Sequence, residues 1–128
     1  MFAYLSLARI LQADAAACLA MGLGFVLLPG PVARILALPE GLVLWAGVLL
    51  FPAAALMIAA SLRPGKVLLA LVVGGNVAWV LASLALVPAG WVTPNAFGTG
   101  AILLQAGVAA LFTWAEARGL RPEAGRAA

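Results

Sequence analysis

The sequence predicts an all-α polytopic membrane protein with four transmembrane helices in an up-down bundle and both termini in the cytoplasm. Hydrophobic residues make up 66% of the 128 residues and charged residues only 9%, whereas a soluble domain has about 25% charged residues. The apolar residues gather in four runs, each near the ~20 residues that a membrane's hydrocarbon core requires. Backbone groups in lipid must be hydrogen-bonded within their own segment, so such runs form helices rather than strands.

The predicted helices follow one another with short connections, and the chain forms a single transmembrane domain. They cover about residues 10–28, 41–62, 67–87 and 96–115. Prolines mark their limits, because Pro29 ends the first run, Pro39 precedes the second and Pro88 ends the third. Residues 31–38 are mostly apolar with one basic residue, and we expect them to form a short segment that lies at the outer membrane interface. An ordered loop is the alternative. Residues 117–128 are expected to form a cytoplasmic tail.

The distribution of basic residues predicts the orientation. One side of the membrane, with both termini and the second connection, receives six of the seven basic residues, namely Arg9, Arg63, Lys66, Arg118, Arg121 and Arg126. The other side has only Arg34. Because basic residues favour the cytoplasmic side, both termini are expected there. The net charge of +3 therefore reflects membrane topology and gives no indication of nucleic-acid binding.

Aromatic residues support the same arrangement. Trp45 and Trp91 fall near the expected outer interface, and Tyr4 and Trp114 near the inner one, as in an aromatic belt. Trp79 does not fit this belt, because it falls near the middle of the third predicted helix.

Four residues are candidates for a polar or ligand-binding cluster: Asp14, Asn76, Trp79 and Gln105. Asp14 is the only charged residue within the four runs, and a charge at the centre of a membrane helix costs roughly 2.5 kcal/mol or more. Asp14 and Asn76 fall at similar depths, with Gln105 somewhat deeper. These groups either form interhelical hydrogen bonds or a ligand or proton site, and Arg9 is an alternative partner for Asp14.

Two further patterns concern helix packing. Small residues recur at four-residue spacing in three rows, namely Ala16-Ala20-Gly24, Gly74-Ala78-Ala82 and Ala106-Ala110. Such rows let helices approach closely, so they predict either packing inside the bundle or association with a protein partner or a second copy. On the fourth helix, a stripe at helical spacing consists of Gln105, Ala109, Phe112 and Glu116.

The residue types that the chain lacks exclude several kinds of site. The sequence has no histidine, which excludes histidine-ligated haem, di-iron and the common zinc sites. A single cysteine, Cys18, excludes an internal disulfide. No Ser/His/Asp set can form. We therefore expect no catalytic residue, cofactor or metal, and we do not expect an enzyme.

Parts of the chain resemble small four-helix bacterial inner-membrane proteins of the DoxX-like kind. The resemblance rests on Gly22, Gly24, Pro29 and Trp45-Ala46-Gly47 within residues 19–47, on Asn76-x-x-Trp79, and on a fourth helix with Gln105 and Glu116. It implies a compact four-helix bundle in a bacterial cytoplasmic membrane. It implies no catalytic residue.

Three hypotheses for the function follow. The leading one is a non-catalytic integral membrane protein, either an accessory subunit of a membrane complex or a homo-oligomeric scaffold. The second is a small proton-coupled transporter that uses Asp14, since small four-helix transporters also depend on one acidic residue in the first helix. The third is a lipid or quinone site lined by Asn76, Trp79 and Gln105.

Overall fold

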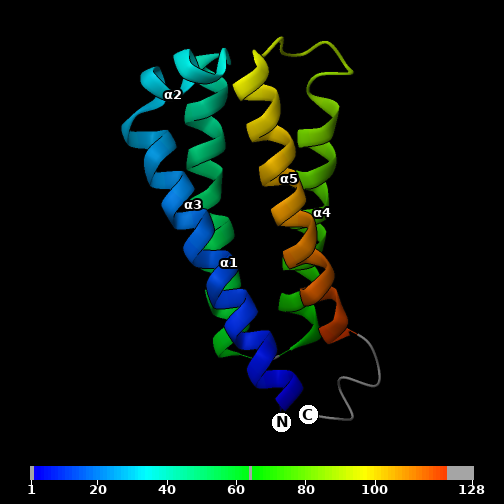
Figure 1. Cartoon of the computed structure of the whole chain (residues 1–128). Coiled ribbons are helices and arrows are strands. Elements are labelled where there is room, and N and C mark those ends of the chain that lie inside the picture. Colours follow the sequence, from blue (N-terminus) through cyan, green and yellow to red (C-terminus); the bar gives the residue numbers. More distant parts are fainter. Residues whose placement is uncertain (1, 64, 121–128) are drawn as a thin grey trace.

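The computed structural model describes residues 2–63 and 65–120, with side chains from residue 7 onward, and all regular structure in this part is helical (Figure 1). The helices are α1 (Phe2–Leu27), α2 (Pro29–Leu36), α3 (Glu40–Leu62), α4 (Lys66–Ala85) and α5 (Ala96–Ala117), followed by the 3-10 turn η1 (Arg118–Leu120). The prediction of an all-α chain is confirmed.

Four segments within the described residues are long and apolar enough to cross a membrane. They are Leu7–Leu27, Glu40–Leu62, Lys66–Ala85 and Ala96–Leu120, between 20 and 25 residues each. Their outer faces expose many large apolar side chains, which a soluble monomer rarely gathers into one surface. These features are those of a multi-pass membrane protein, and the prediction of four helices long enough to span a membrane is confirmed.

Helix α1 and helix α5 both extend beyond the predicted apolar runs. α1 begins at Phe2 rather than near residue 10, because a single arginine at the end of an apolar run does not interrupt helical hydrogen bonding. α5 includes Ala117, and η1 continues it into the expected tail. The rest of that tail, residues 121–128, lies outside the described residues, as does the side chain of Tyr4.

Residues 29–36 form a short helix, so the alternative of an ordered loop before α3 is wrong. Pro29 and Pro31 fit the first turn of α2, where the missing N–H groups would have no helical partner. Ala37 ends the helix in the left-handed conformation, with φ 55°, and the N–H of Leu38 donates to the carbonyl of Ala33 at 3.0 Å. Ala33 is buried whereas Arg34 is exposed, so α2 is amphipathic.

Hydrogen bonds of the Asn95 side chain connect the start of α5 to the end of α2. Asn95 Oδ1 accepts from the N–H of Gly98 at 2.8 Å, which caps α5, and Asn95 Nδ2 donates to the carbonyl of Ile35 at 2.8 Å. A side chain at Gly98 would collide with the carbonyl of Leu36, so glycine permits this close approach. The connection between α4 and α5 is therefore held against the short helix.

The long helices form two close pairs, α1 with α3 and α4 with α5. The first pair is in close contact at Gly22 and Gly47, since a Cβ at Gly47 would lie 2.7 Å from Phe25 Cβ and 3.1 Å from the Gly22 carbonyl oxygen. The pairs meet where α3 contacts α4 and α1 contacts α5. Figure 1 shows the start of α1, the end of α3, the start of α4 and the end of α5 at one end of the bundle.

The main core lies in this half of the bundle and joins α1, α3 and α4. Its buried members are Leu11, Ala15, Ala54, Met57, Ala60, Leu69 and Val72. η1 packs over the same end of the bundle, against α1 and α4. The contact is close, since a Cβ at Gly119 would lie 2.6 Å from Leu7 Cδ2 and 2.8 Å from Leu69 Cδ2. The buried polar groups lie beside this core.

Candidate functional site: a buried carboxyl pair

Asp14 lies inside the bundle, where it contacts Asn76. Its side chain is 5% exposed, and Nδ2 of Asn76 donates to its Oδ2 at 3.1 Å. Asp14 Oδ1 lies 3.8 Å from the sulfur of Cys18, one turn further along α1. That sulfur is also 4.0 Å from Sδ of Met57, which belongs to the apolar core. The structure thus brings together two of the four predicted site residues, from α1 and α4.

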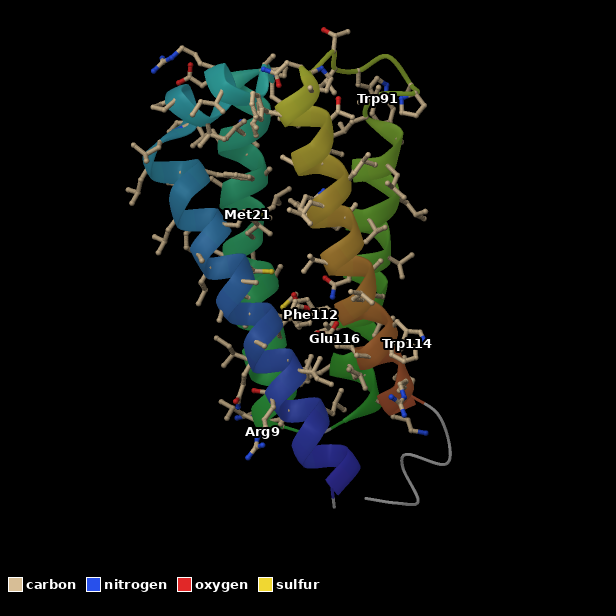
Figure 2. All side chains as sticks on the ribbon, viewed as in Figure 1. Arg9, Met21, Trp91, Phe112, Trp114 and Glu116 are labelled. Carbon is tan, nitrogen blue, oxygen red and sulfur yellow. The ribbon has the colours of Figure 1, made fainter. Side chains whose placement is uncertain are left out.

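A second carboxyl group, that of Glu116 on α5, completes this cluster. The same Nδ2 of Asn76 donates to Glu116 Oε1 at 2.8 Å. Glu116 is 0% exposed and points into the bundle (Figure 2). Because this one nitrogen lies within 3.1 Å of an oxygen of each, the two carboxyl groups are neighbours in the bundle. We call Asp14, Asn76 and Glu116 the carboxyl cluster.

Glu116 is a site residue that the sequence interpretation missed. The fourth predicted helix ends at about residue 115, which places Glu116 at the junction with the expected tail. The available signal was the stripe of Gln105, Ala109, Phe112 and Glu116, which places Glu116 on the same face of α5 as the predicted site residue Gln105. Helix α5 continues past the apolar run, and its inward face is still buried at Glu116. The carboxyl group is therefore inside the bundle.

Arg9 does not pair with Asp14, so that alternative is wrong. Arg9 is exposed and lies on the outside of the bundle in Figure 2, and the described residues include no ion pair between the two side chains. Arg118, the basic residue nearest to Glu116 in sequence, lies over the ring of Trp114, 5.3 Å from its centroid. Neither arginine neutralises the negative charge of the carboxyl cluster.

The other two predicted residues, Trp79 and Gln105, form a separate hydrogen-bonded pair. The indole Nε1 of Trp79 donates to Gln105 Oε1 at 2.8 Å, and Gln105 Nε2 donates to the carbonyl of Ile102 at 3.1 Å. The hydroxyl of Ser83 donates to the carbonyl of Trp79 at 2.7 Å. This pair accounts for a tryptophan in the middle of a membrane helix, because the indole N–H needs an acceptor away from water.

The carboxyl cluster is suited to binding a proton or a hydrogen-bond donor. Two acidic groups share a single amide nitrogen, and Glu116 Oε2 is buried without a hydrogen-bond partner among the described residues. Within those residues, no group of three metal-ligating side chains could hold a metal ion. Acidic residues within membrane helices are rare and usually functional, so this cluster is the strongest candidate site.

The rows of small residues differ in where they face. Gly74, Ala78 and Ala82 are all exposed on α4, and a Cβ at Gly74 would meet no atom within 4 Å. We call these three residues the α4 row. Ala16 and Ala20 of the first row are exposed as well, whereas Ala106 is buried. The first two rows therefore do not pack the interior of the bundle.

Comparison of the chain with protein-family models, with curated proteins and with solved structures finds no match. The resemblance to DoxX-like proteins therefore stays a prediction.

Proposed function

We propose that this chain is a non-catalytic integral membrane protein that works by association, as a homo-oligomeric scaffold or as an accessory subunit of a membrane complex. Its four long helices cross a bacterial cytoplasmic membrane in alternating directions, with both termini in the cytoplasm. The exposed basic residues at Arg63 and Lys66 and the exposed Arg34 at the other end support this orientation. Thiol labelling of a cysteine placed at Gly65 would test it, because only a membrane-permeant reagent should react.

The observation that supports association is the outward-facing α4 row. Inside the bundle, α1 and α3 approach closely because Gly22 and Gly47 remove side chains from their contact. The α4 row offers the same kind of flat surface to the outside, and no atom of the described part of the chain lies within 4 Å of where a Gly74 Cβ would be. Helices in lipid associate by close packing of such surfaces, because lipid supplies no hydrophobic drive between them. A helix of a second copy or of a partner subunit fits this face.

Mass measurement of the protein extracted in a mild detergent tests the proposal. We expect the wild-type chain in a defined assembly larger than a monomer. Ala78→Leu should weaken that assembly at least tenfold, because a branched side chain separates the two helix backbones. Ala55→Leu is the matched control, since Ala55 is also an exposed alanine within a long helix, outside the α4 row.

Two results would contradict association through this face. One is a wild-type protein that is monomeric at every detergent and protein concentration at which it stays folded. The other is an assembly that Ala78→Leu leaves as strong as Ala55→Leu does. Unchanged helical circular dichroism in both variants is needed for the comparison.

A further inference from the structure

The carboxyl cluster contains an acceptor that nothing in the described structure satisfies. The amide of Asn76 has two hydrogens, and its nitrogen reaches one oxygen of each carboxyl group, Asp14 Oδ2 and Glu116 Oε1. Asp14 Oδ1 has the weak thiol donor of Cys18. Glu116 Oε2 is buried and has no hydrogen-bond partner among residues 7–63 and 65–120. An unsatisfied buried acceptor destabilises the folded state, and a charged one does so more strongly.

From this arrangement we infer that Asp14 and Glu116 form a proton-binding site, in which one proton is held between the two carboxyl groups. The proton forms an O–H bond at Glu116 Oε2, and this hydroxyl donates to the carboxylate of Asp14. Protonation changes the charge of the pair from −2 to −1 and converts the unsatisfied oxygen into a donor. Asn76 fixes the other oxygen of each group and so holds the pair in this geometry.

No positively charged side chain among the described residues faces the carboxyl cluster, so a proton is the group that can reduce its negative charge. On α1, Cys18 faces Asp14 and Arg9 is exposed outside the bundle. α3 contributes Met57 to this region. Its one acidic residue, Glu40, is at the opposite end of the helix, and Arg63 at its C-terminal cap is exposed. On α4, Lys66 is exposed at the helix start.

On η1, Arg118 lies over the ring of Trp114. Thus no cation of the described residues faces the pair from any helix packed against it. Carboxylates that share a buried site resist ionising together, and two carboxyl groups in such a site share a proton. The membrane strengthens this effect, because an uncompensated charge within a membrane helix is energetically unfavourable.

The position of the pair connects proton binding to the packing of the bundle. Asp14 belongs to the α1–α3 pair of helices, whereas Glu116 belongs to the α4–α5 pair. Release of the proton to water leaves two like charges across this contact, which repel one another. Uptake of the proton restores a hydrogen bond between α1 and α5. The site therefore binds a proton more tightly when the two helix pairs are closed together.

Infrared spectroscopy of the full-length protein in lipid bilayers tests this inference directly. A protonated carboxyl group has a C=O stretch that is separate from that of a carboxylate. We expect this band at neutral pH in the wild-type protein and in the control Glu40→Gln, whose side chain is exposed. Glu116→Gln should remove the band. Asp14→Asn should weaken it, because this change takes away the neighbouring carboxylate whose charge keeps the proton on Glu116.

Either of two results would overturn the inference. The first is a wild-type spectrum without a protonated-carboxyl band at neutral pH, which needs no variant to fold. The second is a band that Glu116→Gln leaves unchanged. Repeating the wild-type spectrum with added Na⁺ or Ca²⁺ separates a cation site, because a bound cation would displace the proton and remove the band. The outcome does not depend on association, since a monomer holds the complete pair.

Discussion

Asn76 is the residue on which the polar centre of the bundle depends. Its side-chain nitrogen is the only donor that the described residues provide to both carboxyl groups, at 3.1 Å from Asp14 Oδ2 and 2.8 Å from Glu116 Oε1. A buried polar group is tolerated when it is hydrogen-bonded and is costly when it is not. The energetic importance of Asn76 therefore comes from the two acids that it satisfies.

Replacing Asn76 with leucine, which has a similar volume and no polar atom, should destabilise the fold by roughly 2–4 kcal/mol, because two buried carboxyl groups each lose a donor. The comparison variant is Trp79→Phe, which removes one neutral hydrogen bond to Gln105 and should cost about 1 kcal/mol. Reversible unfolding in mixed micelles measures both. Equal losses for the two variants would contradict the role assigned to Asn76.

The sequence predicted part of this cluster and missed the rest for identifiable reasons. Asp14 and Asn76 could be paired because both are polar and lie at similar distances from the ends of their helices. Glu116 could not be placed from composition, since an acidic residue just after an apolar run is ordinarily at the membrane surface. Its burial depends on the continuation of α5 and on the packing of η1 against α1 and α4, which are tertiary features.

At the scale of elements, glycine determines how closely the helices approach. Gly22 and Gly47 lie directly opposite each other in the α1–α3 contact, whereas Gly107 on α5 has no atom within 4 Å of its missing Cβ. The sequence did not distinguish these positions, because all are glycines within apolar helices. The short helix α2 was also only partly predictable, since its prolines are compatible with a loop or with the first turn of a helix.

The two kinds of glycine should respond in opposite directions to the same change. Gly47→Ala should destabilise the protein by about 1–3 kcal/mol, because the new Cβ would overlap Phe25 Cβ and force α1 away from α3. Gly107→Ala should stabilise it by about 0.5–1 kcal/mol, because alanine favours the helix and meets nothing. Thermal unfolding in detergent measures both, and a stabilising Gly47→Ala would contradict the close contact.

At the scale of the whole molecule, the bundle consists of two helix pairs joined by an apolar core and by the carboxyl cluster. The class was predictable from composition, because a chain with 9% charged residues cannot build a polar surface. The face of each helix that turns inward was not predictable, since apolar residues occupy both the lipid-facing and the buried faces. The transporter and quinone hypotheses stay predictions, while the proposals of association and of proton binding concern separate surfaces.

The most direct test of the central claim, that Asp14 and Glu116 act as one unit across the two helix pairs, is a double-mutant cycle. The free energy of unfolding is measured for the wild-type protein, Asp14→Asn, Glu116→Gln and the double variant. We predict a coupling energy of about 1 kcal/mol or more, as found for residues in direct contact or in one hydrogen-bond network. Effects of the two substitutions that add within about 0.5 kcal/mol, as for distant sites, would contradict the claim.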